Sequence, residues 1–174
     1  MGFLVSDNLS LRALEPEDLD VLYKWENDSS LWQNGSTLTP YSKFALRDYL
    51  ENSLQDIFQT RQLRLIVEEK KTGNAIGTID MYDYDPLDQR AGVGILLDEA
   101  YRNQGYGTET LQLIENYAFR FLMLKQLYAY APLSNVPSVK LFEKCRYERS
   151  GTLRSWIKTP SGFGDVYFMQ LINQ

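Results

Sequence analysis

Apolar and polar residues alternate along the chain with two periods, one of two residues and one of three to four. A period of two predicts β-strands, because successive side chains of a strand point to opposite faces, whereas a period of 3.6 predicts helices. Near the start, Leu9 and Leu11 alternate with Ser10 and Arg12. By this pattern we expect strands at 9–14, 64–69, 75–82, 91–97 and 127–131, and a closing hairpin of 152–158 and 165–172.

Helical spacing occupies most of the intervals between these strands. Pro16 suits the first position of a helix, and Ser42 is a typical N-cap. The interval 28–41 is rich in Ser, Asn, Gly, Thr and Pro, so we expect a long loop there. The apolar positions predict helices from Pro16, from Ser42 to about Gln59, through 111–122 and through 137–144.

Strands and helices that alternate in this way predict one α/β domain over residues 1–174. A chain of 174 residues with 44% hydrophobic residues fits a single core. The apolar stretches are much shorter than a membrane span, and the start lacks the pattern of a secretory signal. The single cysteine, Cys145, cannot form an internal disulfide. We therefore expect a cytoplasmic protein without a membrane partner.

Charge and the absence of histidine narrow the possible functions. The formal net charge is −5, which argues against a nucleic-acid partner because phosphate binding needs a concentrated basic face. A chain without histidine has no imidazole base, no Ser-His-Asp triad and no His-ligated metal. Any base must be a carboxylate, a tyrosinate, a lysine or a water molecule relayed by one of these. We interpret Cys145 as a small buried hydrophobe and expect no metal site.

A glycine-containing loop separates the strand at 91–97 from the helix that follows. Gly105 and Gly107 permit backbone conformations denied to larger residues, and a helix start offers free N–H groups, so the loop could cradle a diphosphate. Arg102 adds a cation suited to phosphate oxygens. The alternative is a plain strand-to-helix turn. Thr110 stands where a dinucleotide fingerprint needs its third glycine, which disfavours a dinucleotide-dependent oxidoreductase.

Two motifs and the start of the chain resemble a known family. The loop Arg102-Asn103-Gln104-Gly105-Tyr106-Gly107 resembles the Arg/Gln-x-x-Gly-x-Gly/Ala signature of the GNAT superfamily of N-acetyltransferases. The segment 135–147 is similar to its Asn-x-x-Ser/Ala-x-x-Leu-Tyr-Glu-Lys-x-Gly-Phe motif. Residues 11–19 are similar to the opening of ribosomal-protein alanine and bacterial spermidine/spermine N-acetyltransferases.

This resemblance implies a fold and a cofactor. The fold is a twisted mixed sheet of six or seven strands flanked by about four helices, with the fourth and fifth strands splayed apart to admit the pantetheine of acetyl-CoA. The backbone of Ile95, Leu96 and Leu97 would bind pantetheine, and the diphosphate would be held by Arg102, Asn103, Gln104, Gly105, Tyr106, Gly107 and Thr108. Asn135, Ser138, Phe142 and Lys144 would lie along the same channel. From the residues alone, Asn135 could equally cap a helix, Phe142 belong to the core and Lys144 be a solvated cation.

The proton-transfer groups are where the chain departs from the family. Phe142 replaces the tyrosine that often acts as general acid, Gly92 stands where a glutamate is common, and Arg146 occupies the usual glycine position. Our catalytic candidates are Asp80 as base or relay, Ser138 as a donor near sulfur and Tyr82 as an alternative acid. Each could instead be solvent-facing or locally hydrogen-bonded. Positioning alone, with water as proton carrier, could also suffice.

The leading hypothesis is acetyl transfer by direct attack, in a ternary complex, on a polyamine, another small amine or a protein N-terminus. An alternative is a CoA-binding regulatory module without turnover, suggested by Phe142 and Gly92. A homo-oligomer is left open. Acidic residues in or near predicted loops could attract a polycation or could be solvated turns; these are Glu26, Asp28, Asp83, Asp85 and Asp88.

Overall fold

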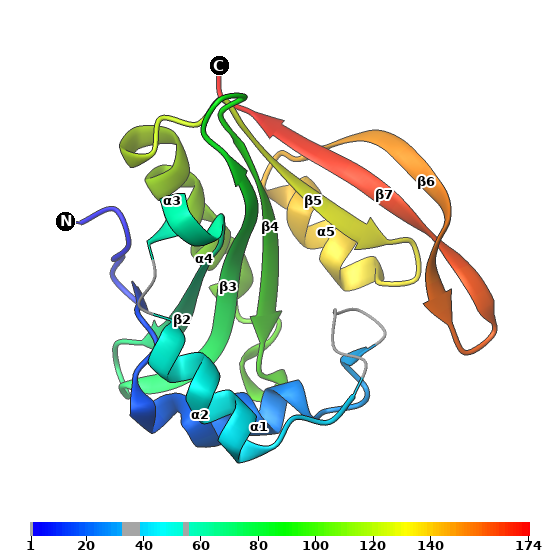
Figure 1. Cartoon of the computed structure of the whole chain (residues 1–174). Helices are drawn as coiled ribbons and strands as arrows, with labels where there is room; N and C mark the ends of the chain where they lie inside the picture. Colours follow the sequence, from blue (N-terminus) through cyan, green and yellow to red (C-terminus); the bar gives the residue numbers. More distant parts are fainter. Residues whose placement is uncertain (1, 33–38, 54–55) are drawn as a thin grey trace.

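The computed structural model describes residues 2–32, 39–53 and 56–174 (Figure 1). In these residues a seven-stranded sheet has the order β1-β2-β3-β4-β5-β7-β6. Neighbouring strands are antiparallel except for β4 and β5, which are parallel. The bounds are β1 Leu9–Arg12, β2 Leu63–Glu69, β3 Asn74–Asp85, β4 Arg90–Leu97, β5 Gln126–Pro132, β6 Glu148–Thr159 and β7 Gly162–Ile172.

Helices cover both faces of the sheet. The α-helices in the described residues are α1 Leu19–Glu26, α2 Lys43–Asn52, α3 Ile57–Thr60, α4 Tyr106–Asn116 and α5 Val136–Lys144. Apolar side chains of α4 and α5 join those of the central strands in the larger core cluster. A smaller cluster on the other face includes Leu22 and Trp25 of α1, Leu50 of α2 and Ile66 of β2. The expected mixed α/β sheet is therefore confirmed.

Three helices differ from the expectation. Pro16 opens a 3-10 turn, Pro16–Asp18, and α1 follows it. The helix expected from Ser42 to about Gln59 is wrong as one element, because α2 ends at Asn52. A separate helix, α3, begins at Ile57. The carboxylate of Asp56 accepts a hydrogen bond from the N–H of Phe58 and so caps the N-terminus of α3. Residues 54–55 lie outside the described part of the chain.

The helix expected at 111–122 begins earlier, at Tyr106, and ends in a π-helical turn at Tyr117–Phe121. In this turn the N–H of Leu122 donates to the carbonyl of Tyr117, five residues back. The long loop expected at 28–41 is only partly described, because 33–38 lie outside the described residues. Its described ends contain neither strand nor α-helix.

Candidate active site

The parallel strands β4 and β5 are paired at one end only. Their register runs from Arg90 opposite Gln126 to Gly92 opposite Tyr128 and goes no further. Beyond Gly92, β4 continues along β3, whereas β5 continues along β7. Alternate backbone groups of an antiparallel strand point away from its partner, so the second half of β4 presents polar groups to the opening. The structure thus contains a splay that can accept an extended chain as an added strand.

The side chains of the expected pantetheine-binding stretch are already used in packing. Ile95 and Leu97 pack on the larger core cluster, and Leu96 packs on the smaller one. What these three residues can offer a ligand in the splay is therefore their backbone. The binding of pantetheine by this backbone stays a prediction.

The loop Arg102–Gly107, which we call the signature loop, places a helix start at the open end of the splay. Gly105 is the N-cap of α4 and has a φ of 90°, a conformation that strains residues with a Cβ. In α4 the N–H of Glu109 donates to the carbonyl of Gly105, so the amides of 106–108 precede this ladder. Amides at this position bind anions readily, because they lack intrahelical acceptors and lie at the positive end of the helix dipole.

The side chains of the signature loop hold its shape. Arg102 donates through Nε to the carbonyl of Leu97 at 3.0 Å, and Gln104 donates to the carbonyl of Ala100 at 3.0 Å. A Cβ on Gly107 would lie 3.1 Å from Leu141 Cδ2, so the first turn of α4 packs closely on α5. The loop and the α5 segment, which sequence reasoning assigned to one cofactor, are therefore adjacent.

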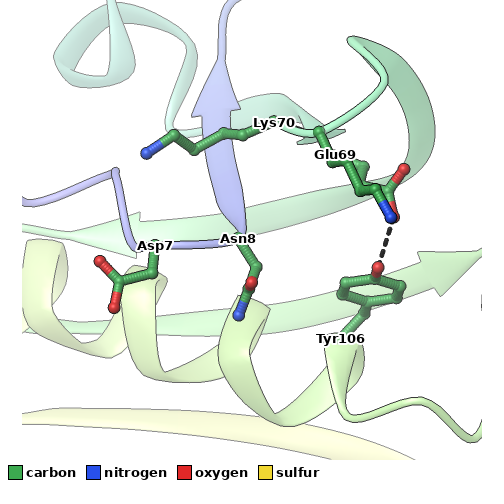
Figure 2. Close-up of a pocket in the computed structure, with 6 residues that line it drawn as sticks. Asp7, Asn8, Glu69, Lys70 and Tyr106 are labelled. Atoms are coloured by element: carbon green, nitrogen blue, oxygen red, sulfur yellow. Dashed lines mark hydrogen bonds between the residues drawn. The ribbon is translucent and has the colours of Figure 1, made fainter.

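The hairpin that joins β2 to β3 anchors both ends of the signature loop. The hydroxyl of Tyr106 donates to Glu69 (Figure 2). The other carboxylate oxygen of Glu69 accepts from the hydroxyl of Thr72 at 2.6 Å. Before the loop, Tyr101 accepts from the side-chain amide of Asn74 at 3.2 Å. The donors Thr72 and Tyr106 lower the pKa of Glu69. Because its hydroxyl is engaged by Glu69, what Tyr106 can offer a diphosphate is its backbone amide.

A cavity lies beside this anchor, and Figure 2 shows its lining. It contains two carboxylates, Asp7 and Glu69, together with Lys70 and Lys71. The ammonium group of Lys70 donates to the carbonyl of Ser6 at 2.8 Å. Mixed charges of this kind do not form a concentrated basic face, so the cavity is a poor site for an anion.

Asp98 joins the end of β4 to α1, and sequence reasoning missed it. Its Oδ2 accepts from Lys24 Nζ at 2.7 Å and from Trp25 Nε1 at 3.0 Å. These two donors lower its pKa to about 2. Asp98 stands directly between a predicted strand and the signature loop, and this position was the signal that could have identified it. A groove beside the junction reaches Leu97 and Arg102.

The residues expected along the pantetheine channel lie on α5 and at its start. Asn135 is the N-cap and accepts from the N–H of Ser138 at 3.3 Å, and Ser138 is half-buried. Phe142 is buried, with its ring 5.0 Å from that of Tyr147. Lys144 is exposed in the last turn. The alternatives of a helix cap for Asn135 and a core position for Phe142 are therefore both present in the structure.

The candidates Asp80 and Tyr82 lie on one face of β3, toward α1 and α2, whereas Ser138 belongs to the layer of α4 and α5. Asp80 is paired in register with Arg64 of β2. The guanidinium of Arg64 donates to both Asp80 oxygens, at 2.6 and 2.9 Å, and to Glu26 of α1 at 2.9 Å. Asp80 is thus one of two carboxylates held by a shared arginine.

Gly92, which replaces a common glutamate, makes room for Tyr82. A Cβ on Gly92 would lie only 2.2 Å from Cε2 of Tyr82, so the tyrosine ring occupies the space that a side chain at position 92 would need. The ring of Tyr128 meets that of Tyr82 edge-on at 6.1 Å, at the last β4–β5 pair. Burial raises the pKa of Tyr82 above its ordinary value. A protonated phenol therefore stands where the two strands part.

The comparisons with known proteins settle the family. A family model described as an acetyltransferase (GNAT) domain matches residues 8–148. The chain belongs to the GNAT acetyltransferase family. It is 29% identical to the uncharacterized N-acetyltransferase p20 of Bacillus licheniformis over 100% of this chain and 98% of the relative.

A sequence and a crystal structure of spermidine N-acetyltransferase from Vibrio cholerae are similar along nearly the whole chain. The spermidine N(1)-acetyltransferase of Vibrio cholerae is 24% identical over 97% of this chain and 95% of its own. A crystal structure of spermidine N-acetyltransferase from Vibrio cholerae in complex with CoA and spermine superimposes with a TM-score of 0.85. It has 23% identity and covers 96% of both chains. This last likeness establishes the fold.

As a GNAT acetyltransferase the protein is an enzyme that uses acetyl-CoA, which confirms the expected activity class and cofactor. The geometry also fits this cofactor. The splay leaves polar strand edges for pantetheine, and the space where a Cβ of Gly105 would stand has nothing within 4 Å, so a phosphate can approach the loop closely. The individual contacts named from the sequence remain predictions.

Most of the acidic residues that could attract a polycation form ion pairs or hydrogen bonds with neighbouring residues. Glu26 pairs with Arg64, and Asp28 accepts from the N–H and hydroxyl of Ser30. Asp85 and Asp88 both pair with Arg90, at 3.2 and 2.7 Å, and Asp83 is exposed at the closed end of the splay.

Among the residues that the structure describes, none of the helices has the length and hydropathy to span a membrane. In the same residues, no three His, Cys, Asp or Glu side chains gather as a potential metal site.

Proposed function

We propose that this GNAT enzyme acetylates a primary amine by direct attack within a ternary complex of enzyme, acetyl-CoA and amine. The observation that carries the proposal is the splay between β4 and β5. The signature loop lies at its open end, and Tyr82 lies where the two strands part. A donor in the splay and an amine from the α1–α2 face would meet beside Tyr82.

The proposed binding of acetyl-CoA uses backbone more than side chains. Ile95 to Leu97 would pair with pantetheine, and the amides of 103–108, with Arg102, would hold the diphosphate. Asn135, Ser138, Phe142 and Lys144 would flank the channel. When bound, acetyl-CoA supplies an acetyl thioester. The residues that hold it exclude water and orient the carbonyl toward the α1–α2 face.

The amine must lose a proton before it attacks, because primary amines are mostly protonated at neutral pH. Glu26 and Asp80 would attract the ammonium form, and water relayed by Asp80 would take its proton. The nitrogen then attacks the thioester carbon, and the C–N bond replaces the C–S bond. The surplus proton on nitrogen passes to the same water relay, and the sulfur leaves as a thiolate or, once it takes up a proton from the relay, as a thiol. Tyr82 keeps its proton because burial raises its pKa, so it would donate a hydrogen bond to the developing charge. Ser138 would serve as a donor near sulfur.

The test is release of free thiol from acetyl-CoA in the presence of primary amines. We expect Tyr82→Phe and Asp80→Asn each to lower kcat at least about tenfold, since each removes one proton-handling group. Tyr167→Phe is the matched control, because that ring lies on the opposite face of the sheet against Arg149. Turnover of both variants near that of the unmodified enzyme would remove the two residues from the mechanism.

A second candidate is a CoA-binding module without turnover, favoured by the buried Phe142 at the usual place of the tyrosine acid. It predicts tight binding of acetyl-CoA with no thiol release for any amine. With the proposed acetyltransferase activity we also propose a cytoplasmic location and a homo-oligomeric assembly. Sedimentation of the purified protein tests the assembly.

A further inference from the structure

Five aromatic rings form a continuous array on the sheet face that carries Tyr82. Successive ring centroids are 5.4 to 6.5 Å apart, within the usual range for aromatic pairs. The array crosses from β3 through β5 and β7 to β6. In order its members are Tyr82, Tyr128, Phe168, Tyr130 and Trp156.

The strand pattern explains why the array faces one way. On β5, Leu127, Ala129 and Ala131 belong to the core cluster shared with α5. Tyr128 and Tyr130 alternate with them and must point to the other face. That face is the one on which α1 and α2 pack over β2 (Figure 1). The array is therefore on the side from which an amine would approach the splay.

Tyr82 at the splay is half-buried, and from Tyr128 outward exposure rises along the array. Tyr128 is 8% exposed at the inner end, whereas Tyr130 is 39% and Trp156 58% exposed at the outer end. Tyr130 and Trp156 are nearly parallel, with an interplanar angle of 19°. Large aromatic surfaces open to solvent and continuous with a reaction site are typical of ligand-binding walls.

The charges at the inner end suit one ammonium group. Glu26 and Asp80 carry two negative charges, and Arg64 cancels one of them. At the closed end of the splay, Asp85 and Asp88 share Arg90 in the same way, and Asp83 is exposed. Outward from this cluster the array offers apolar ring surface, and aromatic faces attract exposed cations only weakly.

We infer that the acceptor is a small arylalkyl amine, with one primary ammonium group at the Glu26–Asp80–Arg64 cluster and a planar apolar body against Tyr130 and Trp156. This inference rests on the proposed function and names its substrate class. Burial of a flat apolar group against aromatic rings is favourable, and it orients the nitrogen toward the splay. Tyr130 and Trp156 are specificity-determining residues in this arrangement.

The first test compares kcat/KM for three amines: phenethylamine, n-butylamine and spermidine. Phenethylamine has the aromatic body, n-butylamine lacks it, and spermidine is a polycation. We expect phenethylamine to exceed both others at least tenfold. A preference for spermidine would overturn the inference, and so would equal values for phenethylamine and n-butylamine.

The second test locates the aromatic contact. Trp156→Ala and Tyr130→Ala should each raise KM for phenethylamine about tenfold, more than they change kcat, and should collapse its advantage over n-butylamine. Trp156→Phe should restore most of it. Phe163→Ala is the matched control, because Phe163 is an exposed ring of the same hairpin outside the array. Unchanged KM in both alanine variants would contradict the assignment.

The two proposals fail in different ways. An enzyme that acetylates n-butylamine without any aromatic advantage refutes the inference and leaves the proposed function intact. An enzyme that acetylates no amine refutes the proposed function. In that case calorimetric titration of the CoA-loaded protein with phenethylamine still decides the inference. If the array binds the aromatic body, the Trp156→Ala variant must bind phenethylamine more weakly than the Phe163→Ala variant does. Absence of binding, or equal binding, would overturn it.

Discussion

Glu115 is an acidic side chain within the apolar layer between α4 and α5. It is 7% exposed, and among the described residues its Oε1 has no hydrogen-bond partner. Burial raises its pKa to about 7, although the charge of Arg146 opposes this. The nearby hydroxyl of Tyr147 is also buried without a partner in the described part of the chain. An ionised carboxylate here destabilises the folded state.

The pH dependence of stability follows from this shift. The ordinary pKa of a glutamate is 4.5 and that of Glu115 is about 7, so the folded state binds more protons between these values. Stability therefore falls as pH rises from 4.5 to 7, by up to about 3 kcal/mol for this group. Glu115→Gln should unfold at higher urea than the unmodified protein at pH 8 and at a similar concentration at pH 5. Glu51→Gln, an exposed control, should change neither. A constant difference across pH would contradict this account.

At single positions the sequence raised the right alternatives without deciding them. The cap and core interpretations of Asn135 and Phe142 depend only on local motifs, and the structure contains both. The reason for a glycine at position 92 depends on which residue lies opposite it on β3. That neighbour, Tyr82, is set by strand register, which local periodicity does not contain.

At the scale of elements, alternation predicted every strand of the sheet to within a few residues. The length of the helix from Ser42 was not predictable, because apolar spacing continues across the point where Asp56 caps a new helix. Contacts between elements were also invisible. Glu69 and Tyr106 are 37 residues apart, and only the turn from β2 to β3 brings the carboxylate to the signature loop.

The anchoring of this loop by the β2–β3 hairpin yields a kinetic prediction. Tyr106→Phe removes the hydroxyl that donates to Glu69, so the loop should be less ordered before acetyl-CoA binds. We expect KM for acetyl-CoA to rise about tenfold, with a smaller effect on kcat, because hydrogen bonds to charged groups are among the stronger ones. Steady-state kinetics with acetyl-CoA as the varied substrate measures this.

A matched control and a second variant separate anchoring from general damage. Tyr117→Phe, in the π-helical turn that follows α4, should leave KM for acetyl-CoA unchanged. Glu69→Gln keeps the size of the side chain and an acceptor, so its effect should be smaller than that of Tyr106→Phe. A fall in kcat with constant KM in Tyr106→Phe would show that the anchor serves catalysis and not cofactor binding.

At the scale of the whole molecule, the splay is a product of topology. The chain crosses from β4 through α4 to a parallel β5, and the two strands then follow different partners. Hydrophobic periodicity cannot show strand order, so the splay could be predicted only from the family resemblance. The core clusters, in contrast, consist largely of the apolar positions whose spacing predicted the elements.

A ligand in the splay would contact β4, the signature loop and α5 together, so we propose that it stabilises residues 1–174 as one cooperative unit. CoA at a hundred times its dissociation constant should add about 2.7 kcal/mol. For a chain of this size that corresponds to a rise of about 5–10 °C in Tm. Calorimetry should show a single transition that moves as a whole. Two transitions, of which CoA moves one, would contradict a single domain.

The shift in Tm should depend on the backbone of one residue. Gly105→Ala forces a side chain into a φ of 90°, at a cost of roughly 1–2 kcal/mol, and therefore weakens the helix start that would hold the diphosphate. Its Tm should respond much less to a fixed CoA concentration. Gly151→Ala is the matched control, because a Cβ there also meets nothing within 4 Å and the backbone has no positive φ. If the Tm of both variants responds to CoA like that of the unmodified protein, binding of the diphosphate does not depend on Gly105. The cofactor must then be held mainly along the strands.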